Sequence, residues 1–237
     1  MNETTVPSGQ LPLPLARFER IDFELFQTRA NLDAVASLRQ TAMGESSRNI
    51  YLWGQSGTGK SHLLQAACTL ASDCGRPVAY IPLTQLSELT PEMLTGLAQY
   101  QLVCVDDLDF IQDIPKWELA LFSLFNEMRA RQTPLLFTAA KSPKGLDITM
   151  PDLKSRLAWD LVYHLTPVDD TVLAAALKLR ARARMFDLPD EVVEFLVKRV
   201  ARDTHTLFDV LNRLDDASLQ SKRKLTIPFV KSTLGLN

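Results

Sequence analysis

The octapeptide GQSGTGKS occupies residues 54–61 and is the most informative stretch of the chain. It matches the pattern G-x-x-x-x-G-K-[ST], in which glycines let successive backbone N–H groups point inward around an anion. The apolar run IYLW precedes it and the helical pattern HLLQAACTLA follows it, which is the strand–loop–helix context that the motif requires. We therefore predict a phosphate-binding loop at a helix N-terminus, where the helix dipole also favours an anion.

Two side chains of this loop carry most of the expected chemistry. Lys60 can reach the β- and γ-phosphates of a nucleotide, and the Ser61 hydroxyl can bind Mg²⁺. The alternative is a glycine turn that meets a helix by chance, and the flanking strand and helix argue against it. The predicted nucleotide-binding residues in this stretch are Gly54, Gln55, Ser56, Gly57, Thr58, Gly59, Lys60, Ser61 and His62.

A second metal anchor is predicted after the apolar run LVCV at residues 102–105. Asp106 ends this predicted strand and can hold Mg²⁺ through water, together with Ser61. Asp107 stands where many P-loop ATPases carry a glutamate that orients the attacking water, and its shorter side chain predicts a weaker base. The alternative for this acidic pair is a solvated turn after a strand.

Around these motifs, short apolar runs alternate with helical patterns. Strands are predicted at 48–53, 77–81, 102–105, 135–138 and 161–165, and helices over 60–72, about 84–98 and 116–131. This alternation favours an α/β fold, a parallel sheet with helices on both faces. From about residue 168 only helical patterns remain, as in Val192, Val193, Leu196, Val197 and Val200 or in Leu207, Val210, Leu211 and Leu214. We expect an extended tail over 1–19, a nucleotide-binding domain over 20–167 and a helical domain over 168–237.

The composition is that of an ordinary globular protein. The 237 residues are 46 % hydrophobic and 23 % charged, and the net charge of -2 argues against a protein that coats nucleic acid. No apolar run approaches the roughly 18 residues of a membrane span, and the N-terminus lacks a secretory signal, so a cytoplasmic location is expected. The cysteines lack metal-binding spacing and are expected to be buried hydrophobes: Cys68, Cys74 and Cys104.

Together these features resemble AAA+ proteins of the bacterial replication-initiator branch, in particular DnaA-homologous regulators that inactivate DnaA. The likeness spans nearly the whole chain, in the segments QLPLPL, GQSGTGKSHLLQA, VCVDDLD, PDLKSRLAWDLVYHLTP, LKLRARARMFDLPDEVVEFLVKR and RKLTIPFVKSTLGL. It implies an AAA+ P-loop core followed by an all-helical lid.

The resemblance also implies a mechanism. Such a protein binds ADP or another nucleoside diphosphate with Mg²⁺, and docks on the DNA-loaded sliding clamp, the beta subunit of DNA polymerase III. There it stimulates hydrolysis of the ATP held by DnaA. DNA is reached only through the clamp, no membrane is involved, and a homodimer is left open.

The tail resembles a clamp-binding peptide, a glutamine followed by leucines that enter an apolar pocket. Its prolines hold the strip extended, which lowers the ordering cost on binding. The alternatives are a flexible tail or a polyproline II ligand of another groove. The residues to which clamp binding is assigned are Gln10, Leu11, Leu13, Pro14 and Leu15.

The segment PDLKSRL at 151–157 resembles the box that presents an arginine finger in AAA+ proteins. This likeness assigns the finger to Arg156, acting in trans on the ATP of DnaA. A planar guanidinium stabilises charge on a transferring phosphoryl group, and such a finger is worth about 10³–10⁵ in rate. The alternative is a salt-bridged surface arginine.

Two positions depart from the pattern of these relatives. Ala139, Ala140 and Lys141 stand where relatives place a polar sensor, and His205 stands where they usually carry an arginine. His205 is either a nucleotide contact or an ordinary helix-cap residue. With Asp107 in place of glutamate, we expect weak or no intrinsic turnover. The competing hypothesis is an ATPase motor or helicase-loader-type protein that hydrolyses its own ATP, which measured intrinsic turnover would distinguish.

Overall fold

The structure is a computed structural model that describes residues 23, 31–167, 169–183, 186–199, 210–211, 213–214, 217–218 and 224–235. The clamp-binding tail residues predicted above, Gln10, Leu11, Leu13, Pro14 and Leu15, lie outside these residues, and so does His205.

The predicted parallel sheet is confirmed. Its five strands are β1 (Ile50–Trp53), β2 (Val78–Pro82), β3 (Leu102–Asp106), β4 (Leu135–Ala139) and β5 (Leu161–His164). They pair in parallel in the order β2-β3-β4-β1-β5. Since the carboxyl ends of parallel strands meet at one edge, the loop after β1 and the acidic end of β3 lie on either side of β4.

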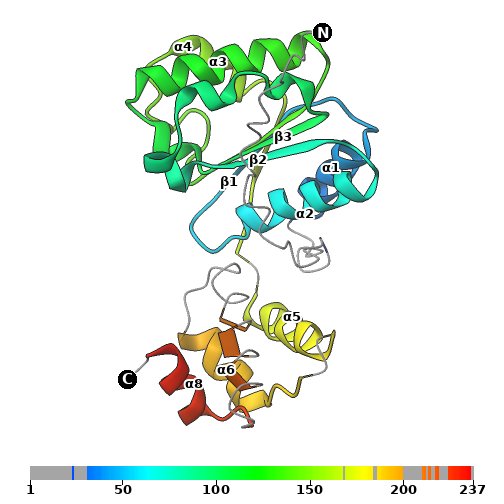
Figure 1. Ribbon diagram of the computed structural model, residues 1–237, viewed down its shortest axis with the longest axis vertical. Helices are drawn as coiled ribbons and strands as arrows, with labels where there is room; N and C mark the ends of the chain where they lie inside the picture. The colour runs from blue at the N-terminus through cyan, green and yellow to red at the C-terminus, as the bar shows by residue number, and fades with distance from the viewer. Residues whose placement is uncertain are drawn as a thin grey trace, which may run out of the picture.

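Helices cover both faces of this sheet (Figure 1). The helices α1 (Leu32–Met43) and α2 (Lys60–Asp73) lie on one face, and α3 (Pro115–Ala130) and α4 (Pro151–Leu157) lie on the other. Alternate residues of β1 enter the two cores, because successive strand side chains point to opposite faces. Ile50 and Leu52 pack with the α1–α2 side, and Tyr51 packs with the α3–α4 side.

The helix predicted over about 84–98 is wrong. The structure has three short 3₁₀ segments there, η3 (Leu83–Glu88), η4 (Pro91–Leu94) and η5 (Leu97–Gln99). Thr90 is extended because it precedes a proline, and Gly96 adopts φ 84°, so the chain turns at both points. Three apolar side chains of this stretch are nevertheless buried, Leu83, Leu94 and Ala98, while Leu86, Leu89, Met93 and Leu97 are half-buried.

After the sheet the described chain is helical, as expected. Its helices are α5 (Asp170–Ala183), α6 (Asp190–Arg199) and α8 (Ile227–Leu234), which Figure 1 shows grouped beyond the sheet. Four residues of the predicted apolar stripe of α6 are buried, Val192, Val193, Leu196 and Val197, and α6 begins directly after Pro189. Buried residues of the next stripe are Val210, Leu211 and Leu214. Val200 and Leu207 lie outside the described residues.

The cysteine prediction holds for two of three residues. Cys68 and Cys104 are buried with their sulfurs 3.3 Å apart, and burial raises the pKa of the Cys104 thiol. Cys74 is exposed, because it caps the C-terminal end of α2 and follows the last buried turn. In the described part of the chain, no group of three metal-ligating side chains exists and no helix is long and apolar enough to cross a membrane.

Candidate functional site

The predicted phosphate loop lies between β1 and α2, and its glycines hold its shape. Gly57 and Gly59 adopt φ 83° and 84°, a left-handed conformation that other residues rarely adopt. A Cβ on Gly54 would lie 2.7 Å from the Leu165 carbonyl oxygen, so the backbone approaches too closely for a side chain. This geometry is what a backbone cradle for phosphate requires.

Lys60 is held at this loop by backbone oxygens. Its Nζ donates to the carbonyl oxygens of Gly54 at 2.9 Å and Gln55 at 3.1 Å, and the side chain is buried. The Thr58 hydroxyl donates to the Gln55 carbonyl oxygen at 2.9 Å, which closes the turn. Both of these partners are neutral carbonyl groups, so the buried ammonium is well suited to an incoming phosphate.

The other predicted residues of the loop differ in their exposure to solvent. Gln55 and Ser56 are exposed at its tip, while Ser61 is half-buried in the first turn of α2. His62 is buried beside it. Ser61 is therefore placed at the helix start from which its hydroxyl could serve as a Mg²⁺ ligand.

Asp106 is a buried carboxylate braced from both neighbouring strands. It is 2 % exposed, and the Tyr80 hydroxyl of β2 donates to its Oδ2 at 2.5 Å. The Thr138 hydroxyl of β4 donates to Oδ1. Gln65 donates in turn to the Tyr80 oxygen at 3.3 Å. Both carboxylate oxygens therefore have donors, and the geometry suits an anion that binds Mg²⁺ through water.

Sequence reasoning missed Tyr80 and Thr138. Tyr80 is the middle residue of β2 and Thr138 lies near the carboxyl end of β4, the two strands beside β3. Burial, and then the charge of Asp106, raises the pKa of the Tyr80 phenol. Each of the two is a polar residue in an otherwise apolar strand, and this pattern could have indicated a contact with the acidic end of the neighbouring strand. Thr138 directly precedes Ala139 and Ala140, the positions where relatives are expected to place a polar sensor. Its own hydroxyl donates to the Asp106 carboxylate.

The turn after Asp106 is shaped by the backbone. Asp107 adopts φ 60° and its N–H donates to the Thr138 hydroxyl at 2.8 Å. It is the N-cap residue of η6 (Leu108–Ile111), in which the Asp109 carboxylate accepts from the Ala140 N–H at 2.6 Å. The acidic turn is therefore joined to the end of β4, and the alternative of a merely solvated turn is wrong for the buried Asp106.

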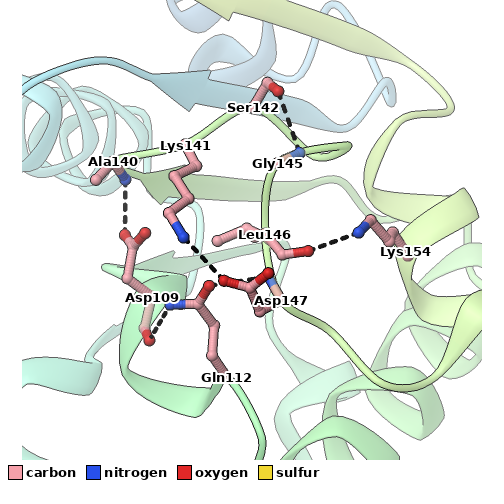
Figure 2. A network of polar contacts seen from close by, with 9 residues as sticks. All are labelled: Asp109, Gln112, Ala140, Lys141, Ser142, Gly145, Leu146, Asp147 and Lys154. Carbon is pink, nitrogen blue, oxygen red and sulfur yellow. Dashed lines mark hydrogen bonds and ion pairs between the residues drawn. The ribbon is translucent and has the colours of Figure 1, made fainter.

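A polar network continues from this turn into the loop between β4 and α4 (Figure 2). Lys141 and Asp147 form an ion pair at 2.8 Å, and Gln112 accepts from the Asp147 N–H at 2.9 Å. Gln112 also donates to the Asp109 carbonyl oxygen at 2.9 Å. Because the ion pair is exposed, it contributes little stability, and the network chiefly fixes the path of the loop.

The same loop is pinned to α3 by Glu118, which sequence reasoning also missed. This carboxylate is 0 % exposed and accepts from the Thr149 N–H at 3.0 Å, the Thr149 hydroxyl at 2.7 Å and the Met150 N–H at 2.8 Å. Met150 is the N-cap residue of α4. Glu118 therefore fixes the start of the helix that carries Arg156.

Arg156 lies half-buried against α3. Its Nη1 donates to the Asn126 side-chain oxygen, and its guanidinium stands 4.5 Å from the Phe122 ring centroid and 5.5 Å from that of Phe125. Among the residues that the structure describes, no carboxylate pairs with it. The alternative of a salt-bridged surface arginine therefore finds no support within the described ranges, where no carboxylate neutralises the positive charge of Arg156.

Two family models match consecutive parts of the chain. The model described as the bacterial DnaA ATPase domain matches residues 19–164, which is more than half of the sequence. The model described as the lid domain of Hda matches residues 169–234.

Solved structures share the fold at low sequence identity. Domain III of the Thermotoga maritima replication initiation protein DnaA is 21 % identical, with 91 % of this chain and 95 % of that one covered and a TM-score of 0.75. AMPPCP-bound DnaA from Aquifex aeolicus is 19 % identical, with 82 % and 66 % covered and a TM-score of 0.62. The Thermotoga maritima RuvB Holliday junction branch migration motor is 17 % identical, with 86 % and 68 % covered and a TM-score of 0.58.

Proposed function

The chain belongs to the bacterial DnaA-type family of AAA+ proteins, and from this membership we propose that it regulates replication initiation by inactivating DnaA. Bound to a nucleoside diphosphate and to the DNA-loaded sliding clamp, it stimulates hydrolysis of DnaA-bound ATP. The observation that carries this proposal is Arg156, which pairs with no carboxylate among the described residues, in a chain whose residues 169–234 match the lid domain of Hda. The reaction takes place in the cytoplasm, where DnaA and the clamp act.

The nucleotide of this chain serves to set its conformation. The loop 54–61 with Lys60 would hold the phosphates, and Ser61 with Asp106 would hold Mg²⁺, which neutralises phosphate charge when bound. The Aquifex aeolicus relative with bound AMPPCP supports an adenine nucleotide, and we propose ADP. Asp107 is too short for an efficient base, so intrinsic turnover is slow.

The two family matches also support the proposed division of the chain. The DnaA-type match supports a nucleotide-binding domain over 20–167, and the Hda-type match supports a lid over 168–237. His205, in the lid, is proposed as a contact to the nucleotide.

Arg156 completes the active site of DnaA rather than that of its own chain. Its polar and ring contacts with described residues come from α3 and Trp159, so loop 54–61 does not engage it. The Asn126 oxygen and the Phe122 and Phe125 rings orient the guanidinium without neutralising its charge. A cation oriented in this way stabilises charge on a γ-phosphoryl group during transfer.

The tail brings this cation to DNA-loaded clamps. In our proposal Gln10 and the leucines at 11, 13 and 15 bind the clamp, and Pro14 keeps the strip extended. The net charge of -2 suits a protein that reaches DNA through the clamp.

A reconstituted hydrolysis assay tests this function. DnaA loaded with labelled ATP is incubated with DNA-loaded clamp, with this chain, and with both. We expect rapid conversion to ADP only when all components are present. Hydrolysis of free ATP by this chain alone, at a rate that matches or exceeds the DnaA-dependent rate, would instead support the motor or loader hypothesis.

A further inference from the structure

Trp159 is a large apolar side chain left in solvent close to Arg156. It lies between α4 and β5 and is 55 % exposed. The Arg129 guanidinium of α3 stacks 4.0 Å from its ring centroid, and that of Arg156 lies 5.9 Å away. An indole that is half in water and flanked by two guanidiniums has the composition of a binding hot spot, in which Trp and Arg are enriched.

The two positive charges of this cluster have no acidic partner among the described residues. Neither Arg129 nor Arg156 forms an ion pair there. The adjacent carboxylate of Asp160 instead accepts from the Asn49 N–H at 3.1 Å and the Asn49 side-chain nitrogen at 2.8 Å. The cluster therefore offers an apolar anchor with a positive rim, and its complement is an apolar pocket beside negative charge.

The fold itself does not require the contact between Arg129 and Trp159. An exposed cation–π pair is worth about 0.5–1 kcal/mol, small beside the stability of a domain. Stacking does reduce the conformational freedom of the Arg129 and Trp159 side chains before a partner binds. Such ordering in advance lowers the cost of association.

We propose that Trp159 and Arg129 anchor the surface through which Arg156 reaches its partner, the nucleotide-loaded face of a DnaA-type AAA+ module. The inference rests on the proposed function of Arg156. The phosphates of the partner's nucleotide supply negative charge that complements the two guanidiniums. The Trp159 indole binds an apolar pocket beside those phosphates. A symmetric contact between two copies of this chain is disfavoured, because it would bring guanidiniums against guanidiniums.

Steady-state hydrolysis of ATP by DnaA distinguishes a residue that binds the partner from the catalytic arginine finger. The full chain and DNA-loaded clamp are held constant while the concentration of ATP-loaded DnaA is varied. Trp159→Ala should raise the half-saturating DnaA concentration about 30-fold with the maximal rate retained, because an anchor binds ground state and transition state equally. Arg129→Gln, which leaves the indole in place, should raise it about 3–10-fold. Arg156→Ala should instead lose the maximal rate.

Leu179→Ala is the matched control, because Leu179 is 57 % exposed on α5 and should leave both constants unchanged. The anchor is refuted if Trp159→Ala and Arg129→Gln behave like Leu179→Ala. It is also refuted if they lower only the maximal rate, or if they change binding to single-stranded DNA or self-association instead. If the wild-type chain gives no stimulation, the proposed function itself fails, which is a distinct outcome. Equal melting temperatures of the variants establish that folding is unaffected.

Discussion

Replacing Glu118 with alanine should lower the free energy of unfolding by about 3 kcal/mol, because this side chain pins the start of α4 to α3. The change removes the acceptor of the Thr149 and Met150 N–H groups and of the Thr149 hydroxyl. A buried donor left without a partner costs about 1–3 kcal/mol. Most of this cost falls on the Met150 N–H, because Met150 is half-buried. Thr149 is exposed, so water can replace part of the hydrogen bonding of its N–H and hydroxyl groups.

Thermal unfolding followed by calorimetry measures this effect. In a chain of this size about 3 kcal/mol corresponds to a melting temperature lower by about 6–12 °C. Glu118→Gln keeps the volume and one acceptor oxygen, so we expect roughly half of the loss. Glu127→Ala, an exposed glutamate on the same helix, is the control and should stay within about 0.5 kcal/mol of wild type.

If the free energies of unfolding of Glu118→Ala and Glu127→Ala differ by less than about 1 kcal/mol, the three hydrogen bonds of Glu118 contribute no net stability and its role at α4 is refuted. A functional consequence follows as well. Freed from Glu118, α4 should hold Arg156 less firmly, so the stimulated hydrolysis of DnaA-bound ATP should fall in the Gln variant at temperatures where it remains folded.

Other parts of the account give further predictions. Lys60→Ala should weaken nucleotide binding at least about 10-fold in a fluorescent ADP titration, because it removes the cation at the loop, and unchanged affinity would contradict a phosphate site. Tyr80→Phe should raise the Mg²⁺ concentration needed for nucleotide binding about 10-fold, since Asp106 loses a donor worth about 1.5–3 kcal/mol. An unchanged Mg²⁺ requirement would limit Tyr80 to a structural role. Clamp binding, measured by surface plasmon resonance, should vanish without loss of folding when alanine replaces Gln10, Leu11 and Leu13.

Local patterns in the sequence were enough to predict much of the fold. The strands and the phosphate loop were predictable because hydrophobic runs and glycine spacing act over a few residues. The three 3₁₀ segments η3, η4 and η5 were not predicted, because the apolar residues of this stretch suggest one helix while Thr90–Pro91 and Gly96 interrupt the backbone. The exposure of Cys74 depends on where α2 ends, which periodicity leaves uncertain by a residue or two.

The supporting residues of the site were harder to predict, because their contacts join distant parts of the chain. Thr138 reaches Asp106 across 32 positions, and Glu118 reaches Met150 across the same separation. Neither belongs to a motif, and only the pairing of β3 with β4 and the packing of α3 on α4 bring them together. The motif residues themselves lie where the sequence predicted them: Lys60 begins α2 and Asp106 ends β3.

We propose that Arg156 acts on nucleotide held by another protein. The most direct test of this proposal is single-turnover hydrolysis of labelled ATP bound to DnaA, with DNA-loaded clamp and either the wild-type chain or Arg156→Ala. We expect Arg156→Ala to keep its clamp and nucleotide binding and to lose at least about 10³-fold in the stimulated rate, with little rescue by Arg156→Lys, which lacks the planar fork. Stimulation retained by Arg156→Ala would contradict this proposal.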